Sequence, residues 1–570
     1  MIALRSTLRV VVTAMLVRAS VGTLVAQGGP PPPAEVSAAQ AALQAGQADS
    51  AIRTLESYFA RNPNAVAGRL LLGNAYAQKG DLDKAVAAYG QVTVPRPARL
   101  QATYLSAGIQ ARRGNVDEAL KLLGQLKASG AYDVELARTN ADFSAVRNDP
   151  RFASVMFAPA DFANPFVEPV RVIHEWRAET KGDQFSWIAR GIGDVDGDKV
   201  SDIVTSAPTF GANGQPASAN GQPAGLGKVY VYSGRTGKLL WARTGTAGEN
   251  LGTGLEGAGD VNRDGVPDVI AGAPGSGHAY VYSGKDGKTL RTLTGTVAEG
   301  YGNSAAGAGD QNGDGYADVI VGAPSSNAKG QGAGRAYVVS GKDGAVLATL
   351  DGQQAGDAFG SIVAGNKRGR ATPVLVGAPG GGPNDRGSVS VFARLTNPPT
   401  RVIAADSTGA ALGAMFTSLV GDVNGDKVPD VYASDFANAA KGAATGRVYV
   451  YSGADGRKLY TLTGENAGDG FGIGSADVGD VNRDGFDDLV VGAWQYSAAA
   501  QSGGKIYLYS GKDGSILRQI TGRVPGETLG FDATGVGDVD GDGVIDLLVT
   551  SSWSNINGFR SGRMFVISGK

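Results

Sequence analysis

The stretch Asp-Val-Asn-Arg-Asp-Gly-Val-Pro-Asp, residues 260–268, occurs with small changes six times, in copies that begin at Asp194, Asp260, Asp310, Asp422, Asp480 and Asp538. Every copy carries Asp or Asn at positions 1, 3, 5 and 9. Oxygen-bearing side chains on alternate residues of a tight turn converge on one point, where a hard cation with about six to eight oxygen ligands would fit. The stretch therefore predicts a cation-binding turn, with Ca²⁺ as the usual ion.

A single copy of this motif is also compatible with a solvated turn, because Asp and Asn favour turns without any metal. Six copies with the same spacing favour the cation, since four packed acceptors repel one another unless a positive charge lies between them. An EF-hand begins similarly but requires a bidentate Glu at position 12 and flanking helices. Position 12 is Thr, Ala or Val here, and β-branched runs such as Val319-Ile320-Val321 follow position 9. Such runs predict buried strands, so the motif is not an EF-hand.

We predict about six structural Ca²⁺ sites, in which the ion neutralises the acidic turns so that each hairpin can close. Position 6 is Gly in four copies but Lys199 and Lys427 in the other two, and a Lys is costly there if the backbone requires a positive φ. We therefore expect weaker binding in these two loops. The predicted ligands are the residues at positions 1, 3, 5, 7 and 9, namely Asp194, Asp196, Asp198, Val200, Asp202, Asp260, Asn262, Asp264, Val266, Asp268, Asp310, Asn312, Asp314, Tyr316, Asp318, Asp422, Asn424, Asp426, Val428, Asp430, Asp480, Asn482, Asp484, Phe486, Asp488, Asp538, Asp540, Asp542, Val544 and Asp546.

The composition excludes several classes of function. The chain has 570 residues, 88 of them Gly, which predicts more than one domain and many tight turns. A formal net charge of −2 gives no electrostatic argument for nucleic-acid binding. The absence of Cys excludes disulfides, thiolate metal sites and Cys nucleophiles. Only His174 and His278 are present, so histidine-based catalysis or zinc binding is not expected.

The first part of the chain differs from the rest. Residues 1–26 are predicted to be a secretory signal peptide, with Arg5 and Arg9 before an apolar stretch. Residues 27–34 are a Pro-rich spacer, and no other run predicts a transmembrane segment. Residues 35–130 show helical apolar spacing, and Ala51, Ala85 and Ala119 recur every 34 residues. Residues 133–156 are predicted to form a capping helix pair, which completes a helical domain over residues 35–156, and residues 157–169 a linker.

The middle helical unit carries Leu72-Gly73, Tyr76, Ala85, Tyr89 and Pro97, and it resembles the tetratricopeptide (TPR) repeat. The small residues allow the two helices of a pair to approach closely. The first and third units depart from the pattern, with Ala39 and Ala107 in place of the Gly. The resemblance implies a groove that binds a peptide or protein, although a spacer or dimerisation element is an equal alternative for so short an array.

From residue 170 to the end, one four-strand unit repeats. A lead-in such as Tyr301-Gly302 precedes the acidic loop, a buried strand follows and ends in a Gly-Ala-Pro sequence, and two further strands complete the unit. A seventh unit retains Phe359-Gly360 but has residues 366–369, Asn-Lys-Arg-Gly, instead of the acidic loop. Seven such units predict a seven-bladed β-propeller. The chain ends at the third strand of the last unit, so we expect the strand at 170–176 to complete that blade.

Residues 170–570 resemble the FG-GAP repeats of the integrin α-subunit propeller, which implies calcium loops on one rim. Six of seven units carry the loop here, whereas integrins usually have fewer. The resemblance implies ligand recognition on the opposite face, with Phe210, Phe436, Trp494 and Trp553 as candidate contacts. The predicted fold is multidomain: an N-terminal all-α TPR-like array followed by an all-β seven-bladed propeller.

The leading functional interpretation is a secreted, periplasmic or cell-surface calcium-binding protein without enzymatic activity. It would act as an adhesion module that binds a protein or glycan through the propeller and a peptide or protein through the TPR region. Two alternatives stay open, namely a glycan-degrading lyase or hydrolase on a propeller scaffold and a structural component of the cell envelope. The enzyme is less favoured because most Asp residues are already assigned to calcium and neither a G-x-S-x-G nor an HExxH motif is present.

Overall fold

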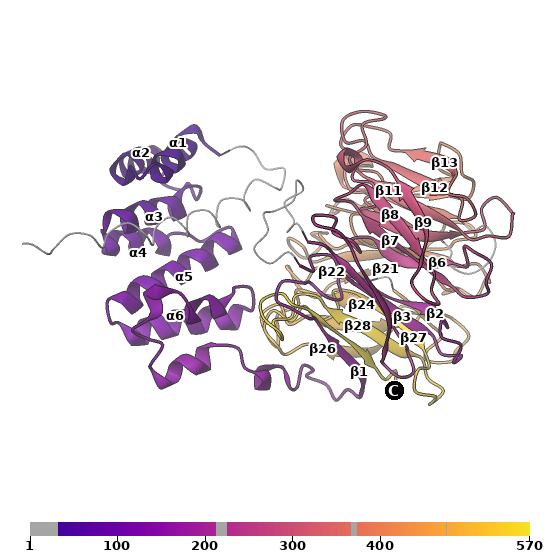
Figure 1. Cartoon of the computed structure of the whole chain (residues 1–570). Coiled ribbons are helices and arrows are strands. Elements are labelled where there is room, and N and C mark those ends of the chain that lie inside the picture. The colour runs from indigo at the N-terminus through magenta and orange to yellow at the C-terminus, as the bar shows by residue number, and fades with distance from the viewer. Residues whose placement is uncertain (1–31, 212–224, 366–372, 475) are drawn as a thin grey trace, which may run out of the picture. The chain divides into compact units, whose positions relative to one another are not determined.

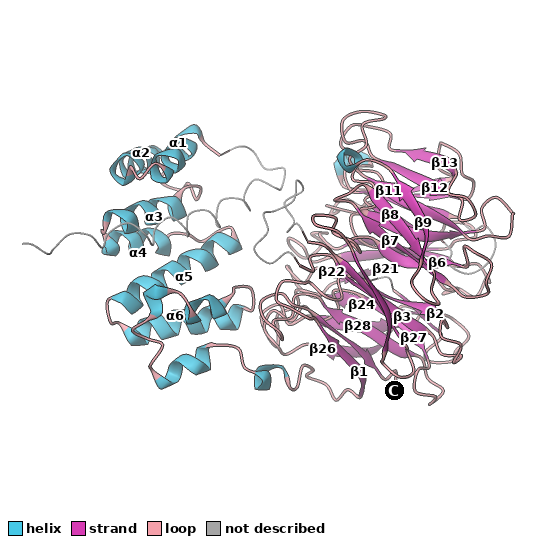
Figure 2. Ribbon diagram, viewed as in Figure 1, coloured by secondary structure: helices cyan, strands magenta, loops and turns pink. Residues whose placement is uncertain are grey.

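The computed structural model describes residues 32–211, 225–365, 373–474 and 476–570 (Figures 1 and 2). The chain forms two compact units, a helical one up to Ala158 and a β-sheet one from Pro159 onward. The predicted signal peptide at 1–26, most of the Pro-rich spacer and the basic segment at 366–369 lie outside the described residues. Among the helices in the described ranges, none combines the length and the hydropathy needed to cross a bilayer.

The helical unit consists of antiparallel helix pairs that pack on one another in chain order. Gly73 allows the second pair to approach closely, since a Cβ built on it would lie 2.3 Å from the ring of Tyr89. This contact confirms the predicted role of the small residue at this position. The helices are α1 (Ala34–Gln44), α2 (Ala48–Arg61), α3 (Arg69–Lys79), α4 (Leu82–Gly90), α5 (Arg96–Arg112) and α6 (Val116–Ser129).

The predicted capping helix pair at 133–156 is wrong in detail, because short 3₁₀ turns stand in its place. The side chains of Asn140 and Asp149 accept backbone N–H groups two residues ahead, so each begins a new turn instead of continuing a helix. Phe143 and Met156 are fully buried under α5 and α6, as a cap requires, whereas Leu136 is exposed. The 3₁₀ segments are η1 (Val134–Arg138), η2 (Ala141–Phe143), η3 (Pro150–Val155) and η4 (Pro159–Phe162); two more, η5 (Val297–Glu299) and η6 (Pro383–Asp385), lie in the β unit.

The second unit is a seven-bladed propeller, which confirms the predicted fold. Each blade is an antiparallel sheet. The second strand of most blades is buried over its whole length, and the outermost strand is largely exposed. The strands are β2 (Ala189–Gly193), β3 (Asp202–Ala207), β4 (Lys228–Tyr232) and β5 (Leu239–Thr244) in blade 1; β6 (Leu255–Gly259), β7 (Asp268–Ala273), β8 (His278–Tyr282) and β9 (Thr289–Thr294) in blade 2; β10 (Ser304–Gly309), β11 (Asp318–Ala323), β12 (Arg335–Val339) and β13 (Val346–Asp351) in blade 3; β14 (Ile362–Ala364), β15 (Val374–Ala378), β16 (Ser388–Phe392) and β17 (Arg401–Ala404) in blade 4; β18 (Thr417–Val420), β19 (Asp430–Asp435), β20 (Arg447–Tyr451) and β21 (Lys458–Thr463) in blade 5; β22 (Phe471–Ile473), β23 (Asp477–Gly479), β24 (Asp488–Ala493), β25 (Lys505–Tyr509) and β26 (Ile516–Thr521) in blade 6; and β27 (Ala533–Gly537), β28 (Asp546–Ser551), β29 (Arg563–Ile567) and β1 (Val172–Arg177) in blade 7.

The ring closes as predicted, because β1, the first strand in the chain, pairs antiparallel with β29, the last one. The first strands of neighbouring blades contact one another all the way round, from β2 through β6, β10, β14, β18, β23 and β27 back to β2. A buried ion pair between Arg563 on β29 and Glu527 supports the closing blade. The same guanidinium approaches Glu175 on β1 at 3.3 Å, so both ends of the propeller's chain meet on one cation.

The last part of the predicted linker is bound to the propeller. The Val167 N–H donates to the Thr521 carbonyl at 2.8 Å, and the Arg523 N–H donates to the Pro165 carbonyl at 2.9 Å. Phe166 packs edge-on against Phe565 with ring centroids 5.2 Å apart. These contacts cover the end of β26, the outer edge strand of blade 6, so the segment before β1 belongs to the propeller.

Candidate cation sites and the opposite face

The six acidic loops lie at equivalent places in their blades, between the first and the second strand. We name them loops 1, 2, 3, 5, 6 and 7 after their blades. Position 1 follows the first strand, directly or after one residue, and position 9 is the first residue of the second strand, as Asp260 and Asp268 show for loop 2. The position-9 residues are Asp202, Asp268, Asp318, Asp430, Asp488 and Asp546.

Within each loop the acidic side chains also hold the backbone of the turn. In loop 2, Asp260 accepts the N–H groups of Asp264 and Gly265 at 3.1 and 2.9 Å. Asp268 accepts the Val261 N–H at 2.9 Å and, with its other oxygen, the Gly284 N–H at 3.0 Å. Gly284 follows the third strand of the blade, so one carboxylate ties together the loop and two strands. The five other loops repeat the bonds made by positions 1 and 9.

Two loops gather three carboxylates each. The oxygens of Asp194, Asp196 and Asp202 in loop 1 lie within 4.8 Å of one another, as do those of Asp538, Asp540 and Asp542 in loop 7. The other four loops carry Asn at position 3, so an amide oxygen takes the place of one carboxylate: Asn262, Asn312, Asn424 and Asn482. An all-oxygen donor set with excess negative charge fits a hard divalent cation.

The position-9 carboxyls are fully buried, and this changes their acidity. Burial, reinforced by neighbouring carboxylates and opposed by backbone N–H donors, raises the pKa of Asp268 to about 7. The same causes raise the pKa of Asp202 and Asp430 to about 6. The pKa values of Asp318, Asp488 and Asp546 are raised as well, again mainly by burial. Each loop thus holds a buried carboxylate whose ionised form a bound cation would stabilise.

The backbone of the loops has a positive φ at two positions, of which we anticipated one. Position 6 has a positive φ throughout, including φ 70° at Lys199 and 68° at Lys427. Position 4 also has a positive φ, and it is Gly in four loops but Arg263 (φ 62°) in loop 2 and Arg483 (φ 63°) in loop 6. Loops 1, 2, 5 and 6 therefore each hold one side chain in a conformation that favours Gly, whereas loops 3 and 7 have Gly at both positions.

Among the described residues, positively charged side chains pair with carboxylates of three of the loops. The guanidinium of Arg235 lies 3.2 Å from Asp198 in loop 1. In loop 3, the ammonium of Lys342 lies 4.0 Å from Asp314. In loop 7, Lys570 lies 3.1 Å from Asp542, and Arg171 pairs with Asp540 and Asp542. A metal ion at these loops would compete with such side chains for the same oxygens.

On the opposite face, two of the four candidate aromatic residues come together. The ring centroids of Trp494 and Trp553 are 4.8 Å apart. They are joined by Phe531 and Trp187, which precede the first strands of blades 7 and 1 and were missing from the prediction. The guanidinium of Arg560 lies over Trp553 at 4.4 Å. We call these four rings and Arg560 the aromatic cluster.

The two other candidates lie outside the aromatic cluster. Phe210 is partly buried under the ammonium of Lys228, which lies 4.8 Å from its ring centre. Phe436 packs against the hydrophobic core between blades 5 and 6. Like the two tryptophans, both follow the second strand of a blade. The sequence position therefore does not tell which candidates gather, and the packing between blades decides it.

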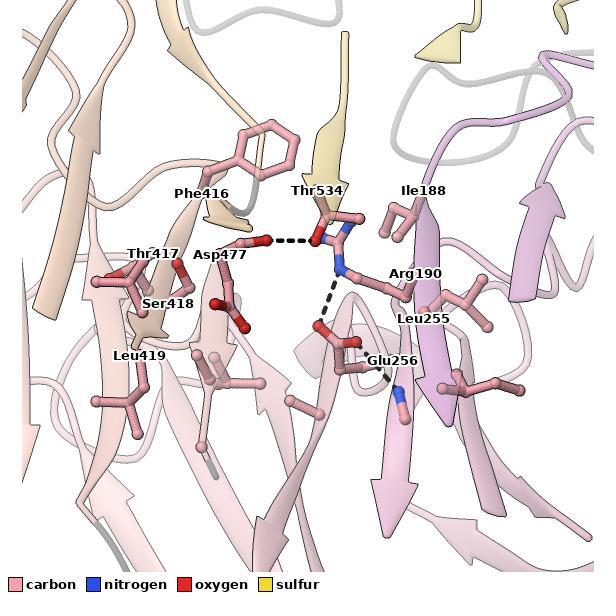
Figure 3. Close-up of a pocket in the computed structure, with 18 of the residues that line it drawn as sticks. Ile188, Arg190, Leu255, Glu256, Phe416, Thr417, Ser418, Leu419, Asp477 and Thr534 are labelled. Carbon is pink, nitrogen blue, oxygen red and sulfur yellow. Dashed lines mark hydrogen bonds and ion pairs between the residues drawn. The ribbon is translucent and has the colours of Figure 1, made fainter. Parts of the chain in front are cut away.

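A cavity of about 830 Å³ lies along the axis of the ring and is lined by the first strands of all seven blades. Trp187 and Phe531 of the aromatic cluster line it as well. Figure 3 shows the buried Arg190 of β2 pointing toward Glu256 of β6, with 3.0 Å between their charged groups. Arg190 also pairs with the fully buried Asp532, which precedes β27. One cation therefore bridges blades 7, 1 and 2 beside the cavity.

Comparison with known proteins agrees with this architecture. Models of an FG-GAP-like repeat and an FG-GAP repeat match residues 260–321 and 473–509, and a tetratricopeptide repeat model matches residues 36–98. Integrin alpha-3 of Cricetulus griseus is 33% identical over 159 residues, which cover 25% of this chain and 15% of that protein. Integrin alpha-2 of Bos taurus is 28% identical over 210 residues, 34% of this chain and 17% of that protein. Integrin alpha-11 of Homo sapiens is 31% identical over 183 residues, 29% of this chain and 15% of that protein.

The match thus spans less than a fifth of the length of these relatives. The two FG-GAP models match repeats in blades 2, 3 and 6 of the propeller. The chain thus carries FG-GAP repeats within a seven-bladed propeller that resembles that of the integrin α-subunits, and a tetratricopeptide repeat precedes them in the sequence.

Proposed function

We propose that the propeller binds Ca²⁺ as a structural ion at its six acidic loops and uses the face opposite these loops to bind a protein or a glycan. The observation that carries the proposal is the repetition of one geometry, in which a fully buried carboxylate at position 9 joins each loop to two strands. An ion beside that carboxylate would offset its burial and stabilise the blade.

The expected stabilisation is moderate for each site and large for the whole ring. Extracellular calcium modules bind with Kd values of about 10⁻⁴ to 10⁻³ M, so about 1 mM Ca²⁺ contributes roughly 0.4–1.4 kcal/mol for each site. Six sites together would contribute a few kcal/mol, which is comparable with the net stability of a domain. This role fits a secreted, periplasmic or cell-surface protein, as the predicted signal peptide at 1–26 suggests.

Thermal unfolding with calcium and with a chelator tests the structural role. All five Trp residues lie in the propeller, so their fluorescence reports this unit alone. We expect the midpoint to fall when calcium is removed, whereas the helical signal in circular dichroism should barely change. Elemental analysis of the purified protein should find bound calcium. An equal midpoint in both conditions would contradict the structural role.

The calcium affinities of the loops should depend on which residues occupy the two positions with a positive φ, positions 4 and 6. A side chain in the left-handed region costs about 1–2 kcal/mol relative to Gly. We therefore expect weaker binding in loops 1 and 5, where Lys199 and Lys427 occupy position 6, and we extend this expectation to loops 2 and 6 because of their Arg at position 4. Calorimetry on variants that retain one intact loop should find loop 3 tighter than loop 2, and the reverse order would refute the argument.

The aromatic cluster supports the binding role of the opposite face, because Trp and Arg are enriched in the residues that dominate binding energies at interfaces. Two of its members, Trp187 and Phe531, also line the axial cavity, so the aromatic cluster and the cavity adjoin each other. The TPR region is proposed to bind a peptide or protein. Glycan arrays and affinity capture with wild type and Trp553→Ala test the binding role of the propeller face, and equal binding by both proteins would contradict it. Release of products from a polysaccharide would favour the alternative of a glycan-degrading enzyme.

A further inference from the structure

Consecutive acidic loops contact each other along the rim of the propeller. The N–H of Ala317, at position 8 of loop 3, donates to the carbonyl of Asp260, at position 1 of loop 2, at 3.0 Å. Loops 5 and 6 share the same bond, from the Asp487 N–H to the Asp422 carbonyl at 2.9 Å. The backbone of a predicted ligand residue in one loop is thus held by the next loop.

Loops 2 and 3 have a second contact through a side chain. Arg263, at position 4 of loop 2, lies between the predicted ligands Asn262 and Asp264. The carbon of its guanidinium is 5.3 Å from the ring centre of Tyr316, at position 7 of loop 3. A Cβ built on Gly315 would lie 3.5 Å from the same carbon, so Arg263 rests against positions 6 and 7 of the next loop.

Arg263 makes this contact from an unfavourable backbone conformation, with φ 62°, at a position that is Gly in four of the six loops. Contacts with the surrounding structure must hold a residue in such a conformation, and residues of this kind are common at ligand clamps and switches. The contact to Tyr316 is one of the surroundings that hold it.

We infer that loops 2 and 3 form a coupled pair, in which an ion bound by one loop raises the affinity of the other through Arg263 and Tyr316. This inference rests on the proposed cation binding. An ion in loop 2 orders Asn262 and Asp264 and thereby fixes the direction of Arg263 between them. An ordered Arg263 then supports the backbone at Gly315 and Tyr316, where loop 3 closes round its own ion. Coupling of this kind is reciprocal, so each ion favours the other.

The chain contains a matched control for this arginine. Arg483 occupies position 4 of loop 6, with φ 63°, and donates to the Gly543 carbonyl in loop 7. It is therefore the same residue type in the same conformation but contacts a different loop. Replacing it removes the same charge and the same strain without touching loop 3.

Terbium is a suitable probe because a nearby tyrosine sensitises its luminescence and the ion takes the oxygen ligands of calcium. Tyr316 is the only Tyr among the predicted ligands, so the luminescence lost on Tyr316→Phe measures loop 3. The experiment titrates Tb³⁺ into full-length wild type and into Asp264→Asn, which weakens loop 2. We expect the loop 3 midpoint to rise, by up to the coupling factor between the two loops, for which about fivefold is the lower range of allosteric couplings. Asp484→Asn in loop 6 should leave it unchanged.

A thermodynamic cycle separates the arginine contact from simple repulsion between charges. The shift caused by Asp264→Asn should shrink when Arg263→Ala is present and should persist when Arg483→Ala is present. An equal shift in all three backgrounds would overturn the role of Arg263, and no shift on Asp264→Asn would overturn the coupling itself. A wild type that binds no Tb³⁺ would refute the proposed cation sites and this inference with them.

Discussion

Removing calcium should reverse the pH dependence of the propeller's stability between pH 7 and pH 5. In the metal-free protein, burial raises the pKa of Asp268 to about 7 and the pKa values of Asp202 and Asp430 to about 6, whereas an unfolded Asp titrates near 3.9. The folded state therefore binds protons more tightly than the unfolded state. The resulting stability is complete below about pH 4 and is lost as the pH rises through 6 and 7.

The magnitude follows from these pKa values. Between pH 7 and pH 5 the metal-free fold gains about 2 kcal/mol from Asp268 and about 1 kcal/mol each from Asp202 and Asp430. With calcium bound, the same carboxylates are ionised in the folded state, so protons compete with the ion and acidification weakens the fold. The sign of the pH effect thus depends on the ion.

Urea unfolding followed by Trp fluorescence measures this sign. The protein is compared at pH 5 and pH 7 after treatment with a chelating resin and again with about 1 mM calcium, near the expected Kd. The control is Asp268→Asn, which is neutral at both pH values and should lose about 2 kcal/mol of the pH effect in the metal-free protein. Metal-free protein that is equally stable at both pH values, or more stable at pH 7, would refute the reasoning.

Two further predictions concern packing. Gly73→Ala should destabilise the helical unit by about 1–3 kcal/mol, because the added Cβ would lie 2.3 Å from the ring of Tyr89. Gly90→Ala, with nothing within 4 Å, should stabilise it by about 0.5–1 kcal/mol, and circular dichroism at 222 nm would contradict us if both variants shifted alike. Glu527→Gln should cost the propeller about 3–5 kcal/mol, because it removes the fully buried carboxylate partner of Arg563 and leaves only Glu175, at 3.3 Å, to face that guanidinium. A loss below about 1 kcal/mol in urea unfolding would show that this pair behaves as a solvent-exposed one.

Much of the propeller could be predicted from the sequence because its information is local and repeated. Most acidic loops are followed by a run rich in Val, Ile or Leu, and Phe359-Gly360 with Gly377-Ala378-Pro379 marks a seventh unit that lacks the loop. The strands at 170–176 and 564–569 are each incomplete as blades. These repeated units and the two incomplete ends sufficed to predict seven sheets and the pairing of β1 with β29. The position of the loops between the first two strands followed from the same order of elements.

The features that were missed depend on contacts between segments far apart in the chain. Trp187 and Trp553 are separated by most of the propeller, and only ring closure brings both to Phe531. The positive φ of Arg263 was hidden because the residue type alone suggests an ordinary backbone, although Gly at position 4 of four other loops was a usable signal. The binding of Phe166 to blade 7 shows no local pattern at all.

The closing blade also has a consequence for biosynthesis. Glu175 on β1 and Arg563 on β29 are 388 positions apart, so the ribosome makes the first strand long before its partner. At about 5–20 residues per second, the first strand waits about 20–80 s with an unpaired edge. An exposed edge invites pairing with another chain, so this interval is when nascent molecules are most vulnerable to joining one another instead of closing on themselves. The segment at 165–168, shortly before that strand, forms its hydrogen bonds with Thr521 and Arg523, so it too lacks these partners until blade 6 has been synthesised.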